Sequence, residues 1–222
     1  MTVNFSTHKE TASILSNPEI IVNPVTGDRM TILHPSKIRF DLPPGAKGSP
    51  LHYHTEMDET FTVLKGCLEM EVGQKGNRRS LQPGESLHVP AGMHHSFCNA
   101  SNDWVAFTTE NRPAEGFERF IRGMYGLAID GKVNSEGMPT NLLQFALLLK
   151  LSDTVPVGIP AILFSSIINA LVWLAQMFKV DGSLLKYWPD FNFSFLKSEK
   201  CHHAIYSTSN NCINCCWING RK

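Results

Sequence analysis

The sequence lacks an excess of charge of either sign, because 20 Lys and Arg balance 20 Asp and Glu in 222 residues. A nucleic-acid-binding protein needs a basic surface against the phosphates, so we do not expect this class of partner. Charged residues make up 18% and hydrophobic residues 42% of the chain, which excludes disorder of the whole. We expect one large domain, or one domain with an extension, around its own core.

A secretory leader and a regular cysteine framework are also missing. Residues 1–10 are polar and no apolar run follows them, so a signal peptide is not expected. Of the six cysteines, Cys67 and Cys98 lie far apart, and the other four fall within residues 201–216. We therefore expect a cytoplasmic protein with reduced thiols, with membrane association as the alternative.

Short apolar runs rich in Ile, Val, Phe and Thr follow a polar arm over residues 1–18. Pro, Gly, Asn and Asp separate these runs, which cover residues 19–22, 30–33, 37–42, 59–72 and 104–109. Apolar and polar residues alternate in Lys37–Leu42, as in a strand with one buried face. Many short strands joined by Pro-Gly turns predict a jelly-roll β-barrel, whose domain we place at residues 19–130.

The pattern changes after Pro113. Apolar residues recur at helical spacing over Glu115–Ile129, and a second helix is predicted over Pro139–Leu151. Residues 154–178 contain no charged residue, and prolines restrict a clean helix there to about residues 161–179. The predicted fold class is therefore mainly β, a barrel followed by an α-helical extension over 139–178 and a Cys/His-containing tail over 179–222.

The most specific pattern is a set of three histidines and a glutamate. His52 and His54 are separated by one residue, and alternate residues of a strand face the same side, so one strand can offer both imidazoles to one metal. Glu59 follows five positions after His54, and an antiparallel barrel can bring the distant His95 beside them. Three neutral imidazoles and a carboxylate suit Fe, Mn, Ni, Cu or Zn, whereas Ca and Mg prefer oxygen ligands.

Two stretches of the chain resemble the motifs of the cupin superfamily. The first runs from Gly45 through His52, His54 and Glu59 to Gly66; six residues separate Gly45 from His52 where the motif has five. The second, GESLHVPAGMHHSFCN over residues 84–99, fits its motif at every position. The resemblance covers about residues 30–110.

This resemblance implies a jelly-roll barrel with a metal in its mouth, held by His52, His54, Glu59 and His95. It also implies a homodimer, and turn positions at Gly66, Gly84, Pro90 and Gly92, since Gly accepts positive φ and Pro fixes φ. A metal-free barrel with relict ligands is the alternative. The substrate would be selected by apolar residues that line the barrel, for which the candidates are Phe40, Met70, Phe97 and Phe107.

Other residues compete for these roles. His94 adjoins His95, and adjacent strand residues face opposite sides, so we expect His94 at the surface or behind the ligands. His88 is a candidate for the same supporting position. Glu56 and Asp58 flank Glu59, and Asp58 fits the allowed spacing with a different side chain.

Two features of the C-terminal third allow alternative readings. Residues 157–178 are long enough for a membrane span, but their prolines and polar residues favour a helix packed on the barrel or on a second subunit. Cys201, His202, His203 and the pair Cys212 and Cys215 have a composition that suits zinc, although the spacing matches no known zinc module, so a disordered tail is preferred.

The function predicted from these observations is metal binding in a cupin domain. One hypothesis is a metal-dependent dioxygenase or isomerase acting on a small organic molecule, with Glu59 as the candidate catalytic residue. The alternative is a non-catalytic barrel that binds or senses a small molecule, tethered to a membrane through residues 157–178. The fold hosts both, so it does not decide between them.

Overall fold

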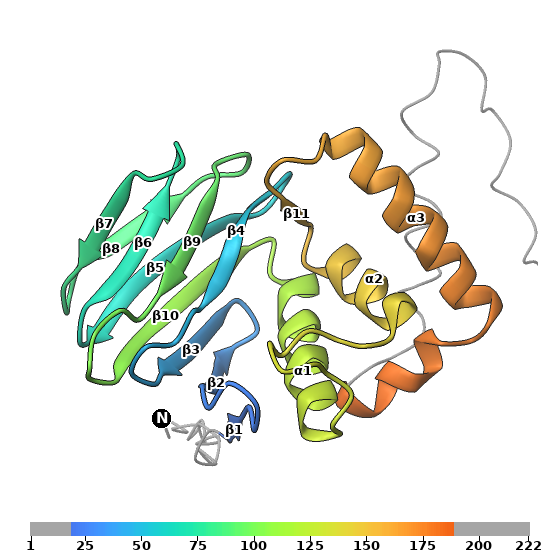
Figure 1. The fold of residues 1–222 in the computed structure, drawn as a ribbon, viewed down its shortest axis with the longest axis horizontal. Coiled ribbons are helices and arrows are strands. Elements are labelled where there is room, and N and C mark those ends of the chain that lie inside the picture. The colour runs from blue at the N-terminus through green and yellow to red at the C-terminus, as the bar shows by residue number, and fades with distance from the viewer. Residues whose placement is uncertain (1–18, 189–222) are drawn as a thin grey trace, which may run out of the picture. The chain divides into compact units, whose positions relative to one another are not determined.

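A computed structural model describes residues 19–188 of the chain. In it, the strands between residues 20 and 112 form two antiparallel sheets (Figure 1). The predicted polar arm over 1–18 and the cysteine-containing part of the tail lie outside the described residues. The first sheet contains, in spatial order, β1 (Ile20–Val22), β2 (Arg29–His34), β3 (Lys37–Leu42), β10 (Val105–Arg112), β5 (Asp58–Lys65) and β8 (Ser86–Val89). The second contains β11 (Thr154–Pro156), β4 (Ser49–His54), β9 (His95–Cys98), β6 (Leu68–Val72) and β7 (Arg78–Leu81).

Strands β1, β2, β3 and β10 follow the predicted runs closely, whereas β4, β7, β8, β9 and β11 lie outside them. The run over 59–72 is two strands, β5 and β6, because the chain turns between them at Gly66, whose φ is +76°. A Cβ at this glycine would lie 2.8 Å from the carbonyl oxygen of Trp104, so both the conformation and the space require glycine. Gly84 and Gly92 also have positive φ, as their motif positions predict.

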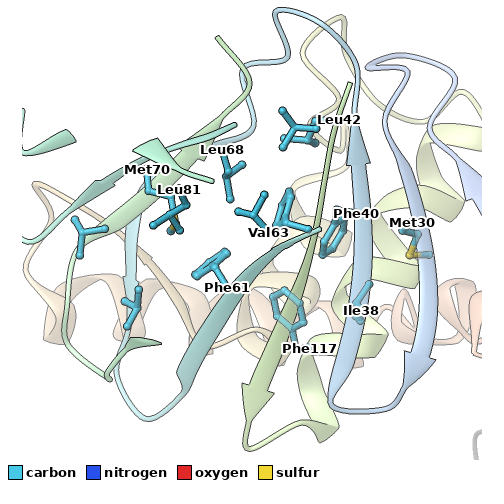
Figure 2. Packing of buried hydrophobic residues seen from close by; sticks show 14 of the residues in the cluster. Met30, Ile38, Phe40, Leu42, Phe61, Val63, Leu68, Met70, Leu81 and Phe117 are labelled. Atoms are coloured by element: carbon cyan, nitrogen blue, oxygen red, sulfur yellow. The ribbon is translucent and has the colours of Figure 1, made fainter. Parts of the chain in front are cut away.

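The core of the barrel is formed by the alternate, inward-facing residues of these strands (Figure 2). In β3, Ile38, Phe40 and Leu42 are buried while the residues between them are only half-buried, which confirms the predicted alternation. Phe61 and Phe107 are among the largest fully buried side chains. Burial of each such side chain stabilises the fold by about 1.5–3 kcal/mol, so the two sheets are held together mainly by these residues.

In the described part of the chain after residue 112, three α-helices and a 3-10 helix lie on one side of the barrel, as Figure 1 shows. They are α1 (Glu115–Ile129), α2 (Leu142–Leu151), α3 (Ala161–Met177) and η1 (Asp181–Tyr187). The bounds of α1 confirm the prediction. Helix α2 begins three residues later than the predicted Pro139, because the side chain of Asn141 accepts hydrogen bonds from the amides of Leu143 and Gln144 and caps the helix there.

Helix α1 connects the barrel to the helical extension. Its Phe117 and Tyr125 belong to the barrel core, and its Leu127 packs with Leu148 of α2 and Leu184 of η1 in a second core. A Cβ at Gly123 of α1 would lie 2.4 Å from a methyl group of Leu148, so this glycine permits the close approach of the two helices. Barrel and extension therefore belong to one compact unit, which extends to Trp188.

Helix α3 is the least buried helix of this unit. Ile168 and Ala175 are its buried residues, whereas Ile162 is 85% exposed. Within residues 19–188, no single helix is long and apolar enough to cross a membrane; α3 and η1 meet that criterion only together, across an 88° bend. The predictions of a membrane segment over 157–178 and of a homodimer stay predictions.

Candidate metal centre

Strands of both sheets bring the predicted ligands together. His52 and His54 lie on β4, and His95, the first residue of β9, is the cross-strand partner of His52. Glu59 reaches the same place from β5 in the other sheet. One ligand atom from each of these residues lies within 4.8 Å of the others. His54, Glu59 and His95 are at most 3% exposed, while His52 is half-buried, so the cluster sits inside the barrel and His52 lies at its edge.

All three imidazoles are held through their Nδ1 atoms. Nδ1 of His52 lies 2.7 Å from the carbonyl oxygen of Pro50, that of His54 lies 2.9 Å from Ser152, and that of His95 lies 3.0 Å from Met93. A carbonyl oxygen only accepts hydrogen bonds, so each Nδ1 carries a proton and donates it. The Nε2 atoms are thereby left as the ligand atoms, an arrangement typical of metal-binding histidines.

Glu59 is held at one oxygen and faces the imidazoles with the other. Its Oε1 accepts a 2.6 Å hydrogen bond from Nδ2 of Asn111, its cross-strand partner on β10. Its Oε2 lies 2.7 Å from Nε2 of His95 and 3.3 Å from Nε2 of His54. Nε2 of His54 is buried and has no hydrogen-bond partner among the described residues. Electron pairs of nitrogen and oxygen thus converge, and a divalent cation would satisfy all of them, so the residues fit a metal ion.

The protonation of the cluster agrees with this donor set. Burial, together with the neighbouring His95 and His54, lowers the pKa of His52 to about 3, so this imidazole is neutral at pH 7. Burial raises the pKa of Glu59, but the close contacts of its carboxylate with His54 and His95 outweigh burial and hold this pKa far below its ordinary value. Burial lowers the pKa of His54, yet the contact with the Glu59 carboxylate leaves it above its ordinary value. A metal ion that binds here therefore competes with a proton on His54.

Residues 38–109 match the family model described as "Cupin domain", and this range contains all four predicted ligands. These residues form a cupin domain. The match confirms the family that the two sequence motifs indicate, and the fold confirms the predicted mainly β barrel with C-terminal helices.

Relatives of known sequence match stretches of different length. An uncharacterised protein of Aquifex aeolicus (strain VF5) is 42% identical over 50 residues, which are 22% of this chain and 40% of that protein. The oxidoreductase iacF of Pestalotiopsis fici is 26% identical over 147 residues, 60% of this chain and 70% of that protein. The chain thus spans well under half the length of the first relative and about two thirds of the second.

Solved structures with a similar fold are also found. A sugar phosphate isomerase of the cupin superfamily from Silicibacter pomeroyi is 24% identical, with a TM-score of 0.39, over 43% of this chain and 71% of that one. A cupin-2 domain protein from Rhodospirillum rubrum is 19% identical, with a TM-score of 0.34, over 38% and 58% of the two chains.

The helical extension outside the cupin domain supports one of the ligands. Strand β11 pairs with β4, and its Thr154 and Pro156 lie opposite His54 and His52. The carbonyl oxygen of Ser152, just after α2, accepts the hydrogen bond from His54. The carboxylate of Asp153 accepts 2.6 Å hydrogen bonds from the hydroxyl of Thr55 and the amide of Glu56. The end of α2 thus fixes both the ring of His54 and the turn that follows it.

The competing residues lie away from the cluster. His94 contacts the ring of Tyr53 and is outside the group of ligand atoms, as predicted for the neighbour of His95. The supporting role considered for His88 is wrong, because its ring is exposed and contacts the hydroxyl of Thr60 on the outer face. The Asp58 carboxylate accepts a hydrogen bond from the amide of Ala91, so Glu59 is the carboxylate of the cluster.

A cavity of about 720 Å³ opens beside the cluster, between the barrel and the helices, and His52 and Glu59 form part of its wall. Phe40 and Phe97, two of the predicted lining residues, also line it. The other two, Met70 and Phe107, are not among its lining residues; they are at most 1% exposed and pack in the barrel core. The cavity is thus walled by the barrel on one side and by the extension on the other.

Sequence reasoning did not identify Asn111 or Ser152. Asn111 had a detectable pattern: it is two and four residues from Thr109 and Phe107, so strand alternation places it on the inner face of β10. An amide on the inner face of a strand beside the predicted Glu59 strand is a partner for a buried carboxylate. Ser152 acts through its backbone carbonyl, which no residue type indicates.

Proposed function

We propose that this protein is a metal-dependent oxidoreductase, of the dioxygenase kind, that acts on a small organic molecule in the cavity beside His52. The observation that carries this proposal is the shared orientation of the three imidazoles. Each donates its Nδ1 proton to a backbone carbonyl, and Nε2 of His54 and of His95 lie 3.3 Å and 2.7 Å from Oε2 of Glu59. Nε2 of His54 has no hydrogen-bond partner among the described residues, which is costly in a buried site without a cation, so this arrangement favours a resident metal over relict ligands.

His52, His54, Glu59 and His95 would hold the ion, and Fe, Mn, Ni, Cu and Zn suit this donor set. When bound, such a metal supplies Lewis acidity and, if redox-active, a place where dioxygen and an organic molecule can react. Four protein ligands leave two positions of a six-coordinate ion open. Glu59 and the half-buried His52 both line the cavity, which supports a substrate position on that side of the ion.

Glu59 is the residue we assign to proton transfer. It lines the cavity and is kept ionised by its contacts with His54 and His95. Its Oε2 would take a proton from the substrate at the stage at which it does not bind the ion, while Asn111 keeps Oε1 fixed. The similarity to an oxidoreductase of Pestalotiopsis fici over 60% of this chain favours oxidation over the isomerase alternative.

The test combines metal analysis with oxygen uptake. The purified full chain is loaded with each of the five metals, and bound metal is measured by elemental analysis for the wild type and for His95→Ala. The matched control is His94→Ala, because it removes the adjacent imidazole, which lies outside the cluster. We expect His95→Ala to lose most of the metal and His94→Ala to retain it.

Oxygen consumption is then followed with a panel of flavonoids, thiols and diketones. Uptake that depends on metal, on a substrate and on His95 supports the proposal. Equal metal content in His95→Ala and the wild type would overturn the ligand assignment. Metal binding without any oxygen uptake would support the non-catalytic binding alternative.

A further inference from the structure

The walls of the cavity beside the metal centre are mainly apolar. The barrel contributes the rings of Phe40 and Phe97, α1 contributes those of Phe117 and Phe120, and α2 and α3 contribute Phe145 and Phe164. Rings of this kind pack against flat apolar surfaces, and a volume of about 720 Å³ lies within the 300–1,000 Å³ range typical of sites for small organic molecules. The cavity therefore fits a ring-containing ligand better than a fully hydrated one.

The charges around the cavity disfavour an anionic ligand. Three carboxylates line it, those of Asp28, Glu59 and Glu136, whereas Lys47 is the one ammonium group among the described lining residues and no arginine lines it. Lys47 and Glu136 are both exposed, so solvent screens both of these charges, and the carboxylates of Asp28 and Glu59 are the less exposed charged groups of the wall. Recognition of a phosphate or carboxylate normally needs several converging cationic or amide donors. This cavity has a surplus of acceptors instead.

A second group of polar atoms lines the cavity on elements that hold no predicted ligand. Tyr125 of α1 is 4% exposed, and its hydroxyl donates a hydrogen bond to the carboxylate of Asp28. Burial and the charge of Asp28 raise the pKa of Tyr125 far above its ordinary value, so the phenol keeps its proton. Because that proton is already directed to Asp28, the phenol oxygen and the carboxylate are left as acceptors for a donor on the ligand.

We propose that the cavity takes a neutral, ring-containing organic molecule that carries at least one hydroxyl or amino group and no phosphate. The rings of Phe120, Phe145 and Phe164 contact its apolar part, and its donor group binds at Tyr125 and Asp28. This inference rests on the proposed function, since it places the reacting part of the molecule beside His52 and Glu59. Phosphorylated sugars are excluded from the substrate class.

The probe for this proposal is 2-naphthol, a neutral fluorescent ring compound with one hydroxyl. Its binding to the metal-free and the metal-loaded full chain is compared with that of 2-naphthyl phosphate and of glucose 6-phosphate. In the metal-free chain we expect 2-naphthol to bind at least about tenfold more tightly than either phosphate, because each phosphate brings two negative charges toward the carboxylates of Asp28 and Glu59. Equal or tighter binding of 2-naphthyl phosphate to the metal-free chain would overturn the proposal.

Two variants locate the bound probe. Ile121 of α1 lines the cavity, so Ile121→Trp should fill part of it and weaken 2-naphthol binding about tenfold or more. Ile129→Trp is the matched control, because Ile129 lies on the same helix, is 57% exposed and does not line the cavity. Equal effects of the two substitutions would place the probe elsewhere and contradict the proposal.

A charge variant keeps the proposal testable if Ile121→Trp fails to fold. Asp28→Asn removes one carboxylate from the wall and should narrow the preference for 2-naphthol over its phosphate severalfold. An unchanged preference would contradict the role of Asp28. The metal readout separates the two proposals: if His95→Ala loses metal but 2-naphthol does not bind, only the substrate class fails. If metal binding is absent and 2-naphthol still binds in the cavity, only the proposed function fails.

Discussion

The cupin domain and the helical extension contribute different things to the same site. The domain supplies every predicted ligand atom, from His52, His54, Glu59 and His95. The extension supplies none of these atoms, but its Ser152 carbonyl orients His54 and its helices form one wall of the cavity. The chemistry thus resides in the barrel, whereas the orientation of one ligand and part of the cavity wall reside outside it.

This difference separates what is general about the fold from what is particular to this chain. The ligand motif determines which metals would fit and where an ion would lie, and other barrels can share it. On our proposal, the wall formed by α1, α2 and α3 selects the molecules that reach this ion, since Phe120, Phe145 and Phe164 all come from these helices. If barrel and extension unfold as one unit, a destabilising substitution in the extension should also lower the stability of the barrel.

We expect the largest effect from substitutions of buried core residues, which test whether the barrel and the extension unfold together. Leu148 of α2 is fully buried against α1, and Phe107 is fully buried in the barrel. Leu148→Ala should lower the free energy of unfolding by about 2–5 kcal/mol and Phe107→Ala by about 3–5 kcal/mol. Because both residues lie in one compact unit, we expect each variant to show a single shifted transition in urea, followed by circular dichroism and by tryptophan fluorescence.

The matched control for this experiment is Leu142→Ala, which makes the same change on α2 at a residue that is 61% exposed. Its free energy of unfolding should change by less than about 0.5 kcal/mol. Two separate transitions in Leu148→Ala, with the barrel transition at its wild-type midpoint, would show that the extension folds independently. The barrel and the helical extension would then be two independently folding domains.

A smaller effect is expected from the barrel residue that supports Glu59. Asn111→Ala leaves Oε1 of Glu59 without its 2.6 Å hydrogen bond in a buried environment. Loss of such a supporting contact typically weakens metal binding by about 10–100-fold. Calorimetric titration with Zn²⁺ measures this, and Asn102→Ala, an exposed substitution of the same type, is the control. Unchanged affinity in Asn111→Ala would show that this amide does not support the carboxylate.

Most of the barrel could be predicted from the sequence because its determinants are local. The alternation of apolar and polar residues in Lys37–Leu42 predicts which side chains face inward, and Gly66 and Gly92 indicate turns that need positive φ. The predicted ligands followed from the spacing of His52, His54 and Glu59, since strand periodicity fixes which side chains share a face. Asn111 was within reach of the same argument, because it shares the inner face of β10 with Phe107.

The contribution of the extension could not be predicted, because it depends on tertiary packing. Ser152 is 98 residues from His54 in sequence and bonds to it through a backbone carbonyl, which every residue type has. Its position depends on how α2 packs on α1 at Gly123, and a glycine within a helix has no single interpretation in a sequence. Similarly, apolar periodicity predicts α1, but not that Tyr125 faces the cavity with its hydroxyl on Asp28.

The smallest effect concerns the residue where the extension holds the turn after His54. Asp153 has φ +50°, a conformation that glycine adopts without strain, so Asp153→Gly preserves the backbone while it removes the hydrogen bonds to Thr55 and Glu56. Each lost hydrogen bond costs about 0.5–1.5 kcal/mol, and relief of the backbone strain offsets part of this, so we expect Zn²⁺ binding to weaken by severalfold.

Lys179→Gly is the matched control, because Lys179 also has positive φ, at +54°, but lies beyond α3 and away from the ligands. Calorimetric titration of both variants with Zn²⁺ separates the contribution of the Asp153 side chain from that of strain relief, because both substitutions relieve backbone strain. If both bind Zn²⁺ as the wild type does, the carboxylate of Asp153 does not position His54, and any influence of the extension on Zn²⁺ binding comes from the carbonyl oxygens of Ser152 and Asp153 and from the β11 pairing.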